Sequence, residues 1–378
     1  MSTSSFLPQH ESVPPLPAGV PHDPAGSPGT TRAAGRRALP NLLVVTGTAA
    51  VAVLSAAGAL PLSAPAFLRF ALGMVAGLNI HVLCDRLLGP LSGLARVWTS
   101  VGVGRRLGST VRRGRLLTFR LLPLIIVSTC HVLVDRPGLR RRLWCGAALT
   151  LLAEVLAAAA LIAAGGRATG IGWGVAAVAA LLATVQPGRV GTPAWRLLRL
   201  PFGQEDQRLT EFLHDPASLA AARAAGAGRI GQARAALDAG EPSGSARRQA
   251  MTAVVALAEG RCGEAARTAA ALRERSVAPA LRREALQLYA CAVGDGIVAG
   301  HWRADEAGPV FSAALAALRS ESSAAFRGTD LAAMEALFLS RPREAEKLAT
   351  RAASTAPDAL ARARALRTRA AALAPTAR

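Results

Sequence analysis

A short pattern, H-V-L-x-D-R, occurs twice in this chain and puts a histidine four residues before an aspartate: His81 before Asp85, and His131 before Asp135. If each segment is helical, the imidazole and the carboxylate lie on one helical face, where they can form a hydrogen bond. Imidazole nitrogens and carboxylate oxygens are also ligands for divalent metals. The two pairs therefore predict either local His–Asp hydrogen bonds where a helix meets a membrane surface or, if they converge, a metal site with N and O ligands.

A single glutamate, Glu154, interrupts a long apolar run. An ionisable side chain is costly inside a membrane and often has a function there. We expect Glu154 either to pair with His81 or Arg69, or to be a protonated or inward-facing structural residue. The remaining histidines lie in polar segments and suggest no site: His10, His22, His214 and His301.

The segment that starts at Ile80 resembles the site-2 protease family of intramembrane zinc metallopeptidases. Gly93 and a turn at Gly102-Val-Gly104 follow His81 at the family's spacing, and Arg120-Leu-Leu-Pro-Leu124 is similar to the family's LLPL element. Further similar elements follow in the family's order at residues 136–142 (RPGLRRR), 145–150 (CGAALT), 184–187 (TVQP) and 191–198 (GTPAWRLL). The resemblance covers about residues 70–200 and implies a membrane core with a small β or re-entrant insert.

The residues that the family's chemistry needs are altered. The family's HExxH motif supplies two zinc-binding histidines and a glutamate that takes a proton from the metal-bound water. The matching positions here are His81, Val82 and Asp85, and Pro193 stands near the place of the third ligand. Loss of a general base alone costs about 10²–10⁴-fold in rate. The resemblance thus implies no catalytic residue, with Val82 at the general-base position, and no zinc or other cofactor.

An active enzyme is the alternative. His131 and Glu154 are possible substitutes for the missing ligands, which would give a zinc metallopeptidase with an unorthodox His/Asp/Glu site. Thr150 and Thr184 stand where the family has asparagines.

Four apolar runs approach the ~20 residues that cross a bilayer: Leu42–Leu60, Ala66–Cys84, Leu143–Gly166 and Gly170–Gln186. Twelve arginines lie between the second and third runs, and such loops stay in the cytoplasm. The sequence therefore predicts a multi-pass cell-membrane protein with four spans and both termini cytoplasmic. Another apolar run, Leu121–Val134, is too short for a span and is expected to be re-entrant or interfacial.

Glycines divide the last two runs. Gly165, Gly166 and Gly170 are expected to form the turn between them. The segment Gly170-Ile-Gly-Trp-Gly174 indicates close helix packing in the membrane, since it lacks the strand–turn–helix context of a nucleotide site.

The two ends of the chain differ in composition. Residues 1–40 are rich in Pro, Ser and Gly and predict a disordered leader. A secretory signal peptide is the rival interpretation, because Arg36 and Arg37 precede an apolar run. Residues 41–200 form the expected membrane core, and residues 205–378 an expected cytoplasmic helical domain.

A short pattern recurs in residues 205–378. Ala227-Gly-Arg-Ile-Gly-Gln-Ala233 is similar to Glu259-Gly-Arg-Cys-Gly-Glu-Ala265, and Ser340-Arg-Pro-Arg-Glu-Ala345 is a looser copy. Small residues at a turn before an Ala-rich helix resemble the second helix of a tetratricopeptide repeat. An irregular helical bundle is the alternative.

The net charge of +20 is uneven: residues 1–202 hold 20 basic and five acidic residues, and residues 203–378 hold 24 and 19. The excess flanks the apolar runs, so it favours a membrane surface over nucleic acid. The five cysteines include no CxxC pair, which favours reduced, buried thiols.

The sequence therefore predicts an all-α membrane protein with a helical-repeat domain. Its core would be a catalytically inactive site-2 protease homologue that binds a membrane segment or peptide, and its helical domain would bind a protein partner. The alternatives are the active zinc metallopeptidase and a membrane anchor or scaffold for the helical domain.

Overall fold

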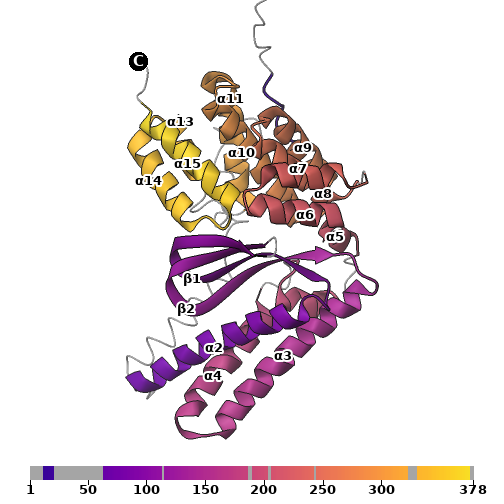
Figure 1. The fold of residues 1–378 in the computed structure, drawn as a ribbon, viewed down its shortest axis with the longest axis vertical. Helices are drawn as coiled ribbons and strands as arrows, with labels where there is room; N and C mark the ends of the chain where they lie inside the picture. The colour runs from indigo at the N-terminus through magenta and orange to yellow at the C-terminus, as the bar shows by residue number, and fades with distance from the viewer. Residues whose placement is uncertain are drawn as a thin grey trace, which may run out of the picture. The chain divides into compact units, whose positions relative to one another are not determined.

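The computed structural model describes residues 12–20, 63–112, 115–185, 190–202, 206–241, 244–321 and 330–374. The described part is mostly helical and contains one small sheet (Figure 1). The chain divides into two compact units. We call residues 28–215 the apolar unit, and residues 1–27 together with 216–378 the helical unit.

Three helices of the apolar unit are long and apolar enough to cross a membrane: α2 (Ala64–Leu88), α3 (Leu139–Ala163) and α4 (Gly166–Thr184). They correspond to the last three expected spans, and each begins two to four residues earlier than the sequence indicated. The first expected span, Leu42–Leu60, lies outside the described residues.

Glycines bring α2 and α4 into close contact. A Cβ atom on Gly73 would lie 2.1 Å from the backbone oxygen of Ile171, and one on Gly174 would lie 2.2 Å from that of Phe70. The expected close packing around residues 170–174 is confirmed. Gly170 itself lies inside α4 and not in the turn, which is formed by Gly165 and Gly166, both at positive φ.

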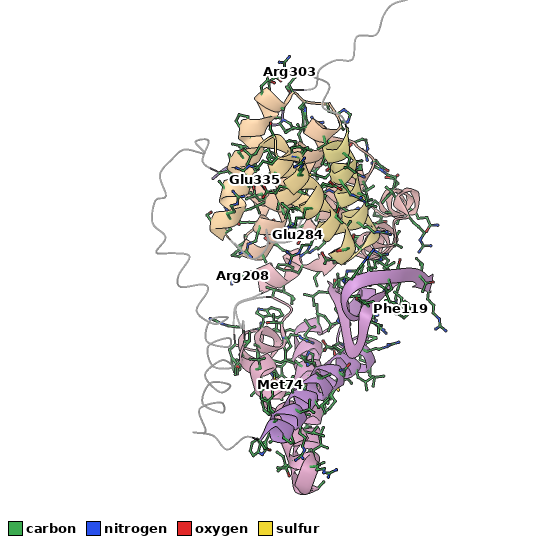
Figure 2. The ribbon with its side chains drawn as sticks, turned by 90° about the vertical axis from the view of Figure 1, so that its left-hand side faces the viewer. Met74, Phe119, Arg208, Glu284, Arg303 and Glu335 are labelled. Atoms are coloured by element: carbon green, nitrogen blue, oxygen red, sulfur yellow. The ribbon has the colours of Figure 1, made fainter. Side chains whose placement is uncertain are left out.

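Between α2 and α3 the chain forms a long hairpin of β1 (Leu94–Arg112) and β2 (Arg115–Val134). Side chains at the start of β2 alternate between the two faces of the hairpin, as in a strand with one buried face. Leu116 and Thr118 are buried, whereas Phe119 is exposed (Figure 2). Leu121–Val134 is therefore part of a paired strand, as the β form of the expected insert requires, and not a separate re-entrant segment.

The expected turn at Gly102-Val-Gly104 is not a turn. These residues lie inside β1, at one of several register shifts between Val101 and Val103. Gly102 has φ +90°, a conformation that glycine tolerates at a bulge. The glycines bend the strand: Trp98–Val101 pair with both ends of β2, at Leu116–Phe119 and at Val127–Cys130.

The segment after α4 closes the apolar unit. It forms a π-helical turn, η1 (Trp195–Arg199), then α5 (Asp206–Glu211) and β3 (Leu213–His214), which pairs in parallel with the end of β2. Leu209 packs in a buried cluster with Leu139 and Leu143. The expected boundary at residues 200–205 was therefore too early, because residues 206–214 belong to this unit.

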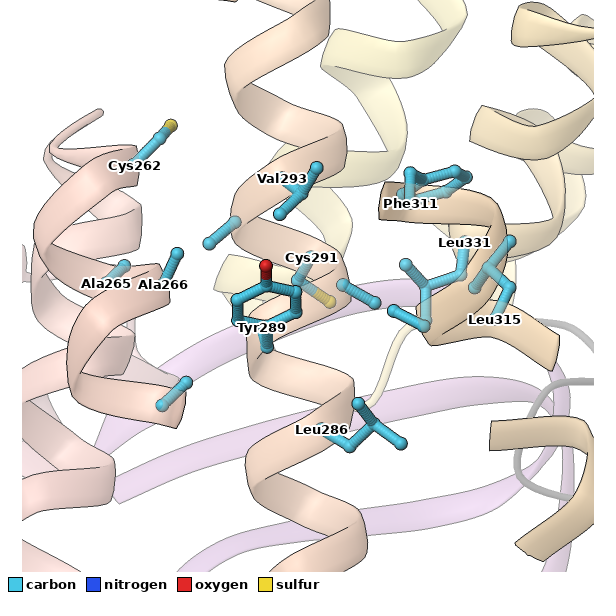
Figure 3. Packing of buried hydrophobic residues seen from close by; sticks show 14 of the residues in the cluster. Cys262, Ala265, Ala266, Leu286, Tyr289, Cys291, Val293, Phe311, Leu315 and Leu331 are labelled. Atoms are coloured by element: carbon cyan, nitrogen blue, oxygen red, sulfur yellow. The ribbon is translucent and has the colours of Figure 1, made fainter. Parts of the chain in front are cut away.

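The helical unit contains nine described helices after residue 215. They are α6 (Pro216–Gly226), α7 (Ile230–Asp238), α8 (Ala246–Ala258), α9 (Cys262–Arg275), α10 (Pro279–Val298), α11 (Ala304–Glu321), α13 (Asp330–Phe338), α14 (Pro342–Thr355) and α15 (Ala359–Leu373). A continuous core of small and apolar side chains runs along α8 to α13, centred on α10 (Figure 3).

The recurring sequence pattern marks helical hairpins. Gly228, Gly260 and Ser340 stand at the turns before α7, α9 and α14, and all three have positive φ. In each turn the following N–H bonds back to a carbonyl five residues earlier, as in Arg261 N to Ala256 O at 2.9 Å. This is the Schellman arrangement that ends a helix and starts a reversal.

Residues 12–20 of the expected disordered leader are packed against the helical unit. Val20 is buried in its core, and Val13 and Leu16 pack against it. The Tyr289 hydroxyl lies 2.7 Å from the carbonyl oxygen of Pro14 and 3.0 Å from that of Pro15. Composition predicted disorder because it does not register an intramolecular partner; the rest of residues 1–40 lies outside the described residues.

Candidate functional site

Four polar side chains form a continuous network in the apolar unit. Arg196 donates from both terminal nitrogens to the two carboxylate oxygens of Asp85, each at 3.2 Å. Asp85 Oδ2 lies 3.7 Å from His81 Nε2. On the other side of the imidazole, Nδ1 lies 2.7 Å from Oε1 of Glu154. The network links α2, α3 and η1.

Burial makes this network energetically important. The side chains of Arg196 and Glu154 are 3% and 2% exposed, and those of His81 and Asp85 are 14% exposed. Isolated buried charges are very costly, so each needs a partner. Arg196 provides a cation beside Asp85, and the His81 imidazole lies between the carboxylates of Asp85 and Glu154.

The position of Arg196 is fixed by its neighbours along the chain. Trp195 and Leu200 are buried with Leu143 in one cluster. Arg140, near the start of α3, donates to the carbonyl oxygens of Leu200 at 2.6 Å and Pro201 at 3.2 Å. These contacts hold both ends of η1, so the arginine between them points at Asp85.

The sequence-predicted positions converge. His81, Thr150, Glu154 and Pro193 line one small pocket between α2, α3, α4 and the segment before η1. Its free volume is about 10 Å³, space for about one water molecule. The pocket is therefore too small for a peptide bond in this conformation.

The residues present do not fit a catalytic zinc ion. A catalytic site needs about three protein ligands and an open position. Here each nitrogen of His81 faces a different carboxylate, and both oxygens of Asp85 accept from Arg196. Within the described ranges, no group of three or more His, Cys, Asp or Glu is arranged to hold a metal.

His131 does not form the expected pair with Asp135. It lies in β2, where residues four apart are ~13 Å apart along the strand. It faces Arg96 on β1 across the hairpin, and its Nε2 is buried with no hydrogen-bond partner among the described residues. Burial lowers the pKa of His131, and the charge on Asp85 opposes this shift. His131 is thus near the network but outside it.

Three further predicted positions have local roles. Val82 is half-buried and does not line the pocket. The hydroxyls of Thr150 and Thr184 donate to carbonyl oxygens one turn earlier, those of Gly146 and Ala180, at 2.9 and 2.7 Å. These threonines therefore satisfy their own helices.

Sequence analysis named His81 as one of two possible partners of Glu154, beside a purely structural role, and assigned no role to Arg196. The relevant pattern was present: Asp85 is an acid in an apolar segment, so it needs a cation. The apolar unit contains many arginines, and the sequence does not show which of them lies beside Asp85 in the folded protein.

A search of known family models, curated proteins and solved structures gives no significant match to this chain.

Proposed function

We propose that this chain is a catalytically inactive, site-2 protease-like membrane protein that binds a membrane segment or peptide without cleaving it. The single observation that carries the proposal is the bidentate contact between Arg196 and Asp85. A fixed guanidinium stands where Asp85, as a second ligand, would meet a metal ion. Val82 at the general-base position supports the same conclusion from the sequence.

The convergence of His81, Glu154 and Pro193 on one pocket also supports the proposal. His81 and Pro193 stand at or near the family's first and third ligand positions, and Glu154 is one of the possible substitutes for a lost ligand. An unrelated helical anchor would have no reason to gather four buried polar groups there, because such groups are costly inside a membrane. A zinc site that has lost its ligands, and whose remaining charged groups are paired, would account for this network.

The four-span topology has independent support. Pro14 and Tyr289 are in contact within one compact unit, so they lie on the same side of any membrane that the chain crosses. The number of crossings between them is then even. Three helices of suitable length are described, and the apolar run Leu42–Leu60 would supply a fourth. The arginine content of the β1–β2 hairpin supports an orientation with both termini in the cytoplasm.

The mechanism follows from this arrangement. The three helices α2, α3 and α4 would cradle a membrane segment against their exposed apolar faces. These include Leu68 and Leu72 on α2 and Leu152 and Leu156 on α3, each more than half exposed. The hairpins of the helical unit would act as tetratricopeptide-like repeats that present a surface to a protein partner.

Zinc content and cleavage activity test the proposal. Purified protein in detergent would be assayed for zinc by mass spectrometry and for cleavage of single-span substrates. We expect no stoichiometric zinc and no chelator-sensitive cleavage, and Val82→Glu alone should not create either. About one zinc per chain, with cleavage abolished by His81→Ala and retained in the exposed control Leu83→Ala, would establish the zinc metallopeptidase instead.

Topology is tested separately. Single cysteines at Ser63 and Arg112, in a background without the native cysteines, would be labelled in intact cells by an impermeant reagent. We expect labelling at Ser63 and none at Arg112. The reverse pattern would refute the proposed orientation.

A further inference from the structure

The leader segment 12–20 contacts the helical unit through one face. Pro14, Pro17 and Val20 are buried, whereas Pro15 and Ala18 are exposed. A burial period of three is the period of a polyproline II helix, in which every third residue lies on the same face. The segment ends in a turn where Val20 N–H bonds to Pro17 O at 3.2 Å and Gly19 has φ +78°. This turn directs Val20 into the core.

One tyrosine anchors the backbone of the segment. Tyr289, the only tyrosine in the chain, is fully buried on α10. Its hydroxyl donates to the carbonyls of Pro14 and Pro15. Carbonyl oxygens of an extended proline-rich chain have no internal partner and are free to accept. Proline-rich peptides are commonly bound against aromatic side chains.

Residue Val20 of the segment enters a buried cluster of the helical unit that contains many alanines. Figure 3 shows the Tyr289 ring on α10 beside Ala265 and Ala266 of α9. Val20 belongs to the same buried cluster as these three residues. Burial raises the pKa of the Tyr289 phenol, so its hydroxyl keeps its proton and remains a donor at neutral pH.

We infer that the α9–α10 face of the helical unit is a binding site for an extended proline-rich peptide, and that residues 12–20 of the same chain are its resident ligand. Tyr289 donates to backbone carbonyls of the peptide, and the site buries the side chain at every third position. A peptide of the Val-Pro-Pro-Leu-Pro type from a partner would have to displace the leader. This inference specifies the partner surface of the proposed function, and its tests are independent of zinc and cleavage.

The experiment uses the full chain with a protease site inserted after Ser27. The protein folds with its leader and is then cut, so that residues 1–27 are held only by non-covalent contacts. A fluorescent peptide of residues 12–20 is added before and after cleavage, and its binding is followed by anisotropy. The uncut chain should bind the peptide at least ~10-fold more weakly, because the tethered leader has a high effective concentration.

Two matched peptides test which face of the proline-rich segment contacts the protein. Pro17→Ala removes buried ring atoms and should bind about 10-fold more weakly. Pro15→Ala makes the same chemical change on the exposed face and should bind as the parent does. In the protein, Tyr289→Phe keeps the ring but removes the donor, and should weaken binding about 3–10-fold.

Retention of residues 1–27 after cleavage, with displacement by the parent peptide, would support the inference. Equal binding of the two alanine peptides, or loss of the leader immediately on cleavage, would overturn it. Leader exchange between differently tagged, uncut chains would also overturn it, because the ligand would then come from a second copy. The peptide comparison remains decisive if Tyr289→Phe fails to fold.

Discussion

Replacing Arg196 by alanine gives the sharpest test of the network in the apolar unit. The substitution removes both donors to the Asp85 carboxylate and leaves that charge largely buried, with the His81 imidazole 3.7 Å away. Breaking a buried ion pair from one side costs about 3–5 kcal/mol. For a unit of this size, each kcal/mol lowers the melting temperature by about 2–4 °C. We therefore expect a decrease of about 6–20 °C.

Thermal unfolding in detergent, followed by tryptophan emission, would measure this change. Trp195 is buried beside Arg196 and is expected to respond when η1 detaches. Arg199→Ala is the matched control, because Arg199 is exposed on the same turn. It should shift the melting temperature by less than about 2 °C, since surface substitutions are usually within ~0.5 kcal/mol.

A double substitution separates charge from packing. Removing both partners with Arg196→Met and Asp85→Leu leaves no unpaired charge, and such replacements are often neutral or stabilising. We expect the double variant to recover most of the loss. If Arg196→Ala is no more destabilising than Arg199→Ala, the argument that this arginine neutralises a buried carboxylate is wrong.

Other predictions concern single residues. Gly174→Ala would place a Cβ 2.2 Å from a backbone oxygen of α2 and should destabilise the protein by about 1–3 kcal/mol, whereas Gly231→Ala meets open space and should be neutral in the same unfolding assay. Burial lowers the pKa of His131, so the unfolded state takes up its proton first and stability falls as pH drops below about 6.5; melting curves at pH 7.5 and 5.5 should show a smaller loss in His131→Gln. Burial raises the pKa of the thiols of Cys262 to about 11 and of Cys291 to about 12, so stability should fall as pH rises above about 9. At pH 8 iodoacetamide should alkylate both thiols only after unfolding, and peptide mass spectrometry that finds them modified in the folded protein would contradict this.

The sequence predicted the three long helices of the apolar unit because continuous apolar runs identify such helices directly. Their close packing was predicted from the glycines of residues 170–174, because small residues let two helices approach closely. Gly102 was misassigned because a positive-φ glycine serves equally in a turn and in a bulge. The choice depends on whether the strand continues on the other side, and only the pairing with β2 decides this.

The candidate site was predicted in part. Glu154 was identifiable because ionisable residues are rare in apolar segments, and His81 and Asp85 because of their spacing and their match to the HExxH positions. His131 was misread because the i, i+4 rule holds only for a helix, and this residue lies in a strand. Arg196 was missed because partner choice among many arginines depends on how Trp195 and Leu200 anchor η1.

The contact between Pro14 and Tyr289 also has a consequence for biosynthesis. The two residues are 275 positions apart. At ~5–20 residues per second, a ribosome needs about 14–55 s to reach the second after the first. The first described segment of the chain is therefore among the last to be buried, and the helical unit cannot be completed until the intervening apolar unit has been synthesised. During that interval residues 12–20 lack the tyrosine that holds their backbone, so their proline-rich face stays accessible until α10 has been synthesised.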